Sequence, residues 1–491
     1  MKQTKLYILT IGLLLGALLL TACSSDALPG DDGGIKEVCR TDSCYINLQI
    51  VNNSQAKTRA VEAATSEENA VYDGILAIFA GTSESTATLK SAVAIDQLLN
   101  NSTDGSGVGN NGTSVNVIQQ LPLSTYSYTN NLYALVLLNT TETGFSVSGN
   151  TLKLNGTSFP NTTTINDIRN SKINSVGSTD KHVGLFMSNA PQDGYIMPEI
   201  TTLFDTETAA RAPEAARVTI NVERAAAKVS VTKVNKGVSG IILNGKNSSR
   251  PSVHAMTWTL NKYNTKSNTV RNGSTSAVNW AQDWNYSTAP ENTYTAKDFA
   301  VYPQHSHSSD VVYVAENTTS DGTSTDANVT EAIVEVQLKD DSNMLMHECF
   351  VFHPFQDTFM ENSYTELYTS RDQYIAYLKA GLTEAQKSAH GLGGKTSAEV
   401  FKYPTITIGE NGTVSITLVN ESFSAEDQTH LASLASWLSE RTTGFRDGKM
   451  YYTYKIKHTG PDSQEYGVVR NNAYNLTLTN GSISRIGRPT P

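Results

Sequence analysis

Charged side chains are scarce in this sequence of 491 residues, where they make up 17% of the total, against about 25% in an average soluble domain. An excess of basic residues is lacking as well, since 37 Lys and Arg stand against 47 Asp and Glu and give a net charge of −10. A protein that binds nucleic acid needs a basic face to neutralise phosphates, so this balance argues against nucleic acid as a partner. Thr, Ser, Asn, Gly and Tyr replace the missing charge, which favours strands and turns.

Cysteine is also rare, with four residues in the whole chain. Cys39 and Cys44 are close enough in sequence to pair in an oxidising compartment. Cys349 lies in residues 344–352, an apolar stretch that predicts a buried strand, so we expect a core thiol there. A zinc site built on Cys39 and Cys44 would need further ligands, which Cys349 alone does not supply.

Catalytic motifs are missing, because the sequence contains no Gly-x-Ser-x-Gly elbow, no Walker A loop and no EF-hand loop. Glycines 107, 109 and 112 match a dinucleotide fingerprint by letters, but they lie in a polar loop. We predict a protein that is not an enzyme and has no cofactor and no metal. Two metal-binding alternatives stay open: the pair His305 and His307, and a Ca²⁺ site in the Asp- and Asn-containing residues 317–328.

The apolar run at the N-terminus has 15 residues, from Leu6 to Leu20, and follows Lys2 and Lys5. A bilayer-spanning helix needs about 20 apolar residues, so this run is typical of a signal peptide. It leads into Leu-Thr-Ala-Cys, which resembles a bacterial lipobox, and a polar tether follows. We predict a signal peptide over residues 1–22 and acylation of Cys23, which would hold the exported precursor at a membrane face.

Short apolar or alternating segments recur along the rest of the chain and are separated by turn residues. This pattern predicts an all-β protein built of sandwiches. Strands are expected at residues 45–51, 71–80, 132–138, 218–222, 228–234, 255–260, 311–314, 332–338, 405–408, 414–419, 450–457 and 473–478. Helices are expected at residues 91–99, 371–378 and 424–441, the last with Ser424 as its N-cap. Residues 206–217 read as a linker, which predicts a domain boundary near residue 215.

Two segments resemble a known family. Residues 222–229, Val-Glu-Arg-Ala-Ala-Ala-Lys-Val, are similar to the stretch that opens the second sandwich of Bacteroidales fimbrillins, the subunits of type V pili. Residues 466–478 and 483–489 resemble the C-terminal end of the same family. Together with the lipobox and a polar loop around Arg59 and Ala60, the layout of the whole chain is similar to that of the family's stalk subunits.

The resemblance implies an all-β fold of two tandem Greek-key (transthyretin-like) β-sandwich domains with a few short helices. It divides the chain into the signal peptide, residues 1–22, and a propeptide with the first strand, residues 23–59, removed on maturation. The N-terminal β-sandwich domain would then span residues 60–215. The C-terminal β-sandwich domain, with a C-terminal donor strand, would span residues 216–491.

The resemblance also implies a structural subunit of a surface pilus that mediates adhesion to host cells or other bacteria and biofilm formation. An arginine-specific protease would cut between Arg59 and Ala60, the first strand would leave its groove, and a strand of another copy would fill it. Tyr45, Leu48, Ile50 and Val51 are expected to fill the groove in the precursor. The donor strand is assigned to Tyr474, Leu476, Leu478, Ile483 and Ile486.

The expected partners are other copies of the chain, accessory anchor and tip subunits, the protease, and receptors on host or bacterial surfaces. The lipidated precursor would reside at the outer membrane, and the mature chain in an extracellular fimbrium. Arg40 is a competing cleavage site, but a cut there would leave the first strand in place. The alternative function is a surface glycan-binding lipoprotein that stays monomeric, with Trp258, Trp280 and Trp284 as candidate platform residues.

Overall fold

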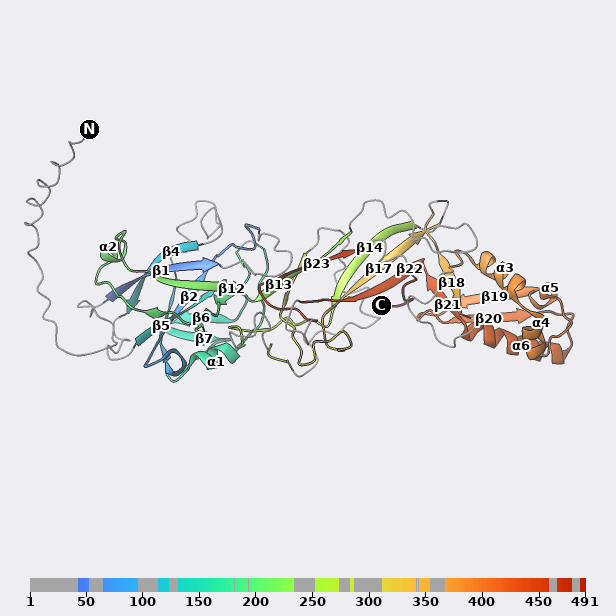
Figure 1. The fold of residues 1–491 in the computed structure, drawn as a ribbon, viewed down its shortest axis with the longest axis horizontal. Coiled ribbons are helices and arrows are strands. Elements are labelled where there is room, and N and C mark those ends of the chain that lie inside the picture. Colours follow the sequence, from blue (N-terminus) through green and yellow to red (C-terminus); the bar gives the residue numbers. More distant parts are fainter. Residues whose placement is uncertain are drawn as a thin grey trace, which may run out of the picture. The chain divides into compact units, whose positions relative to one another are not determined.

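The part of the chain that the structure describes consists mainly of β-strands (Figure 1). The structure is a computed structural model, and it describes residues 43–52, 65–95, 114–122, 131–180, 182–192, 194–233, 252–272, 283–286, 311–340, 342, 344–353, 367–458, 466–478 and 486–491. Among these residues, no helix combines the length and the apolar character that crossing a bilayer requires.

The first half of the chain is built on an eight-stranded sheet with the order β3-β2-β5-β10-β12-β1-β4, in which β11 also pairs with β5. Side chains of β1, β4 and β12 share one apolar core with alternate residues of β2 and β5. The sheet therefore bends over itself and encloses this core like a sandwich. Its strands are β1 (Ser43–Asn52), β2 (Gly74–Gly81), β3 (Thr88–Ala94), β4 (Ser114–Pro122), β5 (Asn131–Leu138), β10 (Met187–Asn189), β11 (Glu199–Ile200) and β12 (Val218–Arg224).

The other face of β2 and β5 carries a second apolar cluster, which smaller elements cover. These elements include a three-stranded sheet of β6 (Phe145–Ser148), β7 (Thr151–Leu154) and β8 (Thr157–Ser158), and the helix α1 (Ile165–Asn170). A short pair of strands, β9 (Lys172–Ile173) and β15 (Ser267–Asn268), links this region to the second half of the chain. The turn η1 (Glu84–Thr86) lies between β2 and β3.

Two three-stranded sheets, β16-β13-β23 and β14-β17-β22, enclose the core of the second half. The fully buried Trp258 on β14 is the largest side chain of this core. The sheets consist of β13 (Ala226–Lys233), β14 (Ser252–Asn261), β16 (Val311–Ala315), β17 (Glu331–Lys339), β22 (Lys449–Lys455) and β23 (Ala473–Leu478). Two layers that share one core are the arrangement of a β-sandwich.

A segment with its own apolar core is inserted between β17 and β22, which are themselves paired neighbours with Gln337 opposite Lys449. We call residues 340–448 the inserted segment. It contains β18 (Glu348–Phe352), α3 (Arg371–Gly381), α4 (Glu384–Ala389), α5 (Ser397–Val400), β19 (Tyr403–Ile408), β20 (Val414–Val419), α6 (Ala425–Glu440) and β21 (Thr442–Arg446). The sequence did not indicate this insertion.

The all-β class with sandwiches and a few short helices is confirmed. The helix expected at residues 424–441 is α6, whose N-cap Ser424 accepts a hydrogen bond from the Asp427 amide. The helix expected at residues 91–99 is wrong where it is described, because residues 91–94 belong to β3 and pair with β2. Their apolar spacing suits a helix, but pairing with a buried strand overrides that local preference.

Two expected strands begin later than predicted. The strand expected at residues 71–80 begins at Gly74, and the one expected within residues 344–352 begins at Glu348. Met344 is 65% exposed, so its apolar character does not indicate burial. The segment read as a linker contains the short helix α2 (Glu207–Ala210).

The domain limits at residues 215 and 216 stay a prediction. The strand that follows them, β12, pairs with β1 in the eight-stranded sheet, whereas β13 begins at Ala226 in the second sandwich. The chain thus passes from one sheet system to the other at Ala225, which is fully buried.

Candidate functional site

The first strand, β1, lies inside the eight-stranded sheet rather than at its edge. It runs parallel to β12, with Leu48 opposite Val218, and antiparallel to β4, with Leu48 opposite Val117. Because it is bonded on both sides, its removal would leave two strands with unpaired backbone groups that face a gap. β1 is thus the first of the described strands in chain order and an internal strand of its sheet.

Four alternate residues of β1 point into the core. Cys44, Ile46 and Leu48 are fully buried, and Ile50 is 2% exposed. Leu48 and Ile50 are thus confirmed as core-facing residues. Tyr45 and Val51 are partly exposed and lie on the other face, so the prediction was wrong for these two residues, and it omitted Ile46. Alternation along the strand was the signal that could have identified Ile46.

Polar contacts also hold β1 in place. The Asn47 side chain, which is buried, donates a hydrogen bond to the Ala210 carbonyl at 3.0 Å. At the end of the strand, Asn52 Nδ2 donates to Asn69 Oδ1 at 2.9 Å. Each bond gives the buried amide NH2 group of its Asn an acceptor, which would be costly to leave without one.

The residues predicted for lipidation and cleavage, Cys23, Arg59 and Ala60, lie outside the described residues, and so does Cys39. Cys44 is disulfide-bonded. The next described residues begin at residue 65, where a turn leads into β2. Residues 53–64, which contain the predicted cleavage site, therefore connect β1 to this turn in sequence.

Glu68 in this turn is a buried carboxylate that reaches the second half of the chain. Its Oε1 atom accepts a hydrogen bond from the Tyr313 hydroxyl at 2.6 Å and lies 3.0 Å from Lys228 Nζ. Arg224 lies 3.6 Å from the other oxygen. Burial alone would raise the pKa of Glu68, but the bonds from Tyr313 and Lys228 outweigh it and lower the pKa. Sequence reasoning missed Glu68, because its partners are far away along the chain.

The two segments that carry the family resemblance lie next to each other in space. Arg224 Nε donates to Asn471 Oδ1 at 3.2 Å, and the Asn471 amide donates to the Ala226 carbonyl at 2.8 Å. From Lys228 onward, β13 pairs in parallel with β23 (Figure 1). The motif residues therefore form the junction at which the chain passes from the first sheet to the second sandwich.

Charged groups are buried beneath this junction. Arg470 and Glu316 are fully buried and form an ion pair at 2.6 Å, and Arg470 also donates to Ser267 Oγ at 2.8 Å. Asp283 lies nearby and accepts hydrogen bonds from Thr318 N and Asn264 Nδ2. Burial and the charge of Glu316 raise the pKa of Asp283 to about 8. Removal of one partner from a buried ion pair leaves an uncompensated charge and is strongly destabilising, which indicates a structural role for this pair.

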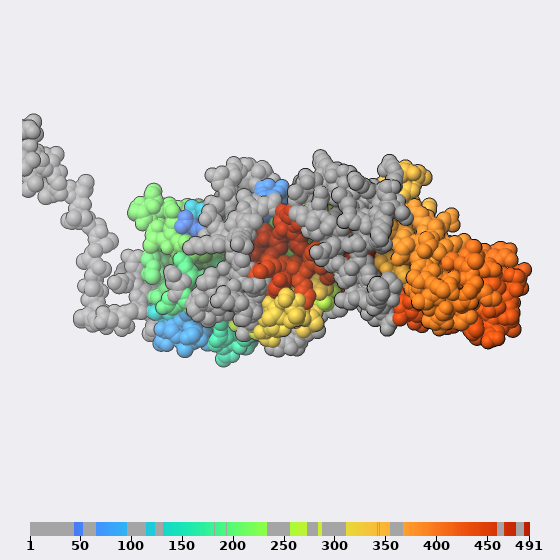
Figure 2. Space-filling view, turned by 45° about the vertical axis from the view of Figure 1, so that its right-hand side comes forward, coloured from blue at the N-terminus to red at the C-terminus, as the bar shows by residue number. Residues whose placement is uncertain are grey.

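The predicted donor residues are divided between the last strand and the C-terminal tail. Tyr474, Leu476 and Leu478 belong to β23, where Tyr474 is buried and Leu476 packs against the sandwich core. The Tyr474 hydroxyl accepts from the Val469 amide at 2.9 Å and bonds with His458 at 2.8 Å. Ile483 lies outside the described residues, and Ile486 is fully buried. Residues near the C-terminus reach the surface in the view of Figure 2, where they are red.

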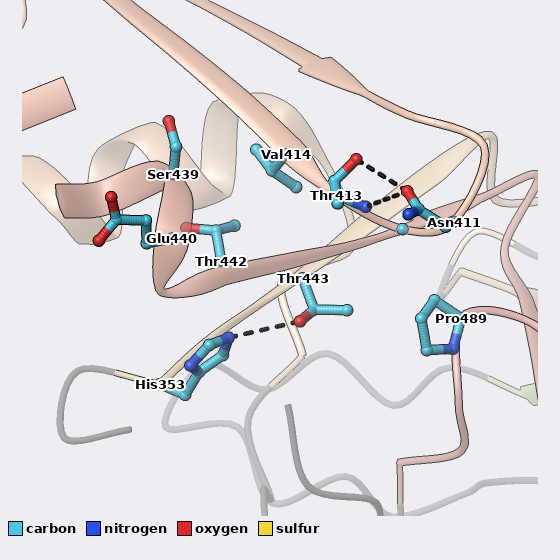
Figure 3. Close-up of a pocket in the computed structure, with 10 residues that line it drawn as sticks. His353, Asn411, Thr413, Val414, Ser439, Glu440, Thr442, Thr443 and Pro489 are labelled. Atoms are coloured by element: carbon cyan, nitrogen blue, oxygen red, sulfur yellow. Dashed lines mark hydrogen bonds between the residues drawn. The ribbon is translucent and has the colours of Figure 1, made fainter. Parts of the chain in front are cut away.

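A cleft of about 400 Å³ lies between the inserted segment and the tail residue Pro489 (Figure 3). Two pairs of its polar side chains bond to each other: Thr443 to His353 at 3.4 Å, and Thr413 to Asn411 at 2.9 Å. Groups already paired in this way are poor candidates for binding a substrate. Pro489 forms one wall, so the cleft marks where the tail meets the inserted segment.

The other candidate residues do not form a site in the described part of the chain. Trp258 is fully buried and cannot serve as a glycan platform, Trp284 lies under Lys172 at 4.3 Å, and Trp280 lies outside the described residues. In the loop proposed for Ca²⁺, Asp326 accepts hydrogen bonds from the Gly322 and Asn328 amides. The described residues contain no group of three or more His, Cys, Asp or Glu side chains that could hold a metal ion.

The remaining motif residues are either buried or outside the described part. Cys349 is buried, and burial raises the pKa of its thiol, as expected of a core residue. Glycines 107, 109 and 112 and the pair His305 and His307 lie outside the described residues.

Comparison with known families gives a match at the C-terminal end. Residues 443–491 match the family model of the major fimbrial subunit protein (type IV), fimbrillin, C-terminal. The resemblance to fimbrillins is confirmed over this segment. The matched residues include β22, β23 and the tail, and they indicate a structural fimbrial subunit rather than an enzyme.

Solved structures with fimbrial roles are similar to part of the chain. A fimbrial assembly protein from Parabacteroides distasonis is 17% identical, with 61% of this chain and 84% of that chain covered and a TM-score of 0.32. The tip fimbrial protein Mfa3 from Porphyromonas gingivalis is 11% identical, with 62% and 79% covered and a TM-score of 0.30. A search of curated proteins gave no match.

Proposed function

We propose that this chain is the structural subunit of a surface pilus and that it polymerises by protease-triggered donor-strand exchange. The observation that carries the proposal is the position of β1, which is first in the chain yet internal in its sheet. After a cut in the loop that follows, β1 is attached by non-covalent contacts alone and leaves without threading the chain. The fimbrillin match at residues 443–491 supports the same role.

Loss of β1 creates a binding groove of defined chemistry. Its floor is the apolar core that Ile46, Leu48 and Ile50 now fill, and its walls are the backbones of β4 and β12. An extended apolar segment can fill this groove, because its alternate side chains pack into the apolar core while its backbone pairs with β4 and β12. Burying one Leu or Ile side chain contributes about 1.5–3 kcal/mol, so several such residues hold a joint firmly.

The contacts that join the first sheet to the second half of the chain lie C-terminal to the cut, so the mature chain keeps them. Glu68 ties the turn after the cleavage loop to Lys228 and Tyr313, so the new N-terminal segment stays next to the junction of the two sheet systems. The propeptide strand has no such tie to the second half of the chain among the contacts of the described residues. Cleavage therefore frees β1 and leaves the rest of the fold intact.

The donor comes from the C-terminal end of another copy. Because groove and donor are different surfaces of one chain, each joint leaves a free groove and a free donor, and the assembly grows as an open filament. We assign the donor to the region that contains Tyr474, Leu476, Leu478, Ile483 and Ile486. Adhesion to host cells or other bacteria, biofilm formation and contact with anchor and tip subunits follow from a surface filament.

Cleavage by an arginine-specific protease is tested with two matched variants, Arg59→Ala and Arg40→Ala. We expect Arg59→Ala to stay full length and form no filaments in electron micrographs. Arg40→Ala should assemble normally, with Ala60 as the first residue in Edman sequencing. Filaments that begin at Thr41, or normal filaments from Arg59→Ala, would contradict the proposal.

The lipid anchor is tested separately, because it concerns export rather than polymerisation. We propose that Cys23 is acylated and holds the precursor at the outer membrane until cleavage. Metabolic labelling with a radioactive fatty acid should mark the wild-type precursor and not a Cys23→Ser variant. Equal labelling of the two proteins would disprove the assignment.

A further inference from the structure

The C-terminal tail, residues 486–491, is bound at one edge of the second sandwich. Ile486 is fully buried in the sandwich core. Arg488 exchanges two backbone hydrogen bonds with Tyr451 on β22, at 2.8 and 2.9 Å, and its side chain bonds with Thr453. On its other side β22 pairs with β17, so the tail covers the second edge of this strand at Tyr451.

Close packing at Gly487 limits how the tail lies on this edge. A Cβ atom at Gly487 would lie 2.8 Å from the Tyr451 carbonyl oxygen and 2.9 Å from the ring of Tyr452. Only glycine fits between the strand and the tail at these distances. The tail is therefore seated against β22 and does not merely pass over it.

The inserted segment makes the second contact with the tail. A Cβ atom at Gly412, in the turn between β19 and β20, would lie 2.5 Å from Pro489 Cβ. The same turn is tied to β21, because the Gly444 amide donates to the Gly412 carbonyl at 2.9 Å. In Figure 3, Pro489 lies beside this turn and closes one side of the cleft. The tail is thus held between β22 and the Gly412 turn.

We propose that the edge of β22 and the Gly412 turn form a resting site for the C-terminal tail of the same chain, and that the inserted segment regulates the release of that tail. The regulatory part rests on the proposed function, since it assigns the tail to the donor region. A tail seated in this way is not free to enter a neighbour's groove. In the precursor, β1 then occupies the groove and the tail occupies the edge of β22, so neither groove nor tail is free for assembly.

The contacts of the resting site are few enough for the tail to detach and rebind reversibly. The contacts described between the tail and β22 are the two-bond bridge at Tyr451, the bond from the Arg488 side chain to Thr453 and the buried Ile486, whereas β1 is bonded along two full strands. A segment with few contacts opens by local fluctuation far more often than the fold as a whole. The Gly412 turn adds its contact with Pro489, and a methyl group added at Gly412 would disrupt that contact.

The test uses the uncleaved full-length chain with Gly412→Ala, and Gly394→Ala as its matched control. Both glycines lie in the inserted segment at positive φ, +80° for Gly412 and +77° for Gly394, but Gly394 has no atom within 4 Å of an added Cβ. The two substitutions strain the backbone alike, whereas only Gly412→Ala also crowds its neighbours, since the added Cβ would lie 2.5 Å from Pro489 Cβ and 3.0 Å from the Gly444 carbonyl oxygen. We expect hydrogen exchange of a peptide covering residues 486–491 to become about tenfold faster in Gly412→Ala, which corresponds to about 1.4 kcal/mol, and to be unchanged in Gly394→Ala.

A second pair of variants keeps the test valid if Gly412→Ala does not fold. Pro489→Ala changes the tail alone and removes the ring that faces the Gly412 turn, and Pro491→Ala makes the same change at a residue that does not line the cleft. We expect faster exchange in Pro489→Ala and wild-type exchange in Pro491→Ala. If neither Gly412→Ala nor Pro489→Ala differs from its control, the resting site is refuted.

Regulation is tested by timing filament growth after cleavage of the same proteins. Faster growth of Gly412→Ala than of Gly394→Ala supports regulation by the inserted segment. Faster exchange of the tail without faster growth overturns the regulatory role. If the cleaved wild-type chain also forms no filaments, the proposed function fails, whereas the exchange result still decides the resting site.

Discussion

Leu48→Ala is the substitution that should loosen β1 in the precursor most clearly. Leu48 is fully buried, and its neighbours in the core come from β4, β12, β2 and β5. Truncation of a buried Leu to Ala costs about 2–5 kcal/mol, because the transfer free energy is lost and a cavity is left. Since β1 is the strand that leaves, this cost weakens its attachment to the groove.

Hydrogen exchange of β4 measures the attachment directly. In the described sheet β4 is the last strand and pairs with β1 alone, so its bonded amides exchange when β1 detaches. A cost of about 2 kcal/mol predicts roughly 30-fold faster exchange in a peptide covering residues 114–122. The protein should carry Arg59→Ala as well, so that the strand stays covalently attached throughout the measurement.

Gln49→Ala is the matched control, because Gln49 is the next residue and lies on the opposite, partly exposed face. A surface substitution changes stability by about 0.5 kcal/mol or less, which corresponds to roughly a twofold change in exchange. Equal effects of Leu48→Ala and Gln49→Ala would refute the assignment of β1 as a groove-filling strand. In finished filaments, from which β1 is absent under the proposed mechanism, Leu48→Ala should have no effect on stability.

Three further predictions concern the second sandwich. Deletion of residues 482–491 should abolish filaments while cleavage continues, and it should lower the melting temperature because Ile486 fills the core; filaments of normal length from this truncation would exclude the tail as donor. Burial and the nearby Arg271 lower the pKa of His458 to about 4, so its contribution to stability should be lost as pH falls from about 6.5 to 4, and His458→Gln should flatten this part of a melting-temperature profile. Asp283 has a pKa raised to about 8, so its contribution should be lost as pH rises from about 4 to 8. Asp283→Asn should melt higher than the wild type at pH 8 and should match it near pH 4, and a lower melting temperature at pH 8 would argue against a buried neutral carboxyl group.

Local pattern and the family resemblance together predicted the class of fold and most of its strands. Alternation identified β1 and β23, and a capping residue with helical spacing identified α6, since these signals depend on a few neighbouring residues. The pattern failed at residues 91–94, where apolar spacing suited a helix. Pairing with β2 made them a strand, because partner and burial decide between the two when the local preference is weak.

The tertiary structure alone decided which distant residues meet. The sequence contains no sign that Glu68 binds Lys228 and Tyr313, that Arg224 contacts Asn471, or that Gly412 faces Pro489. It also does not show that residues 340–448 interrupt a pair of neighbouring strands. Such contacts depend on how the chain closes over long separations, which periodicity does not encode. The local sequence pattern indicated most of the longer strands, and the three-dimensional fold decided which strand lies inside its sheet and where the tail rests.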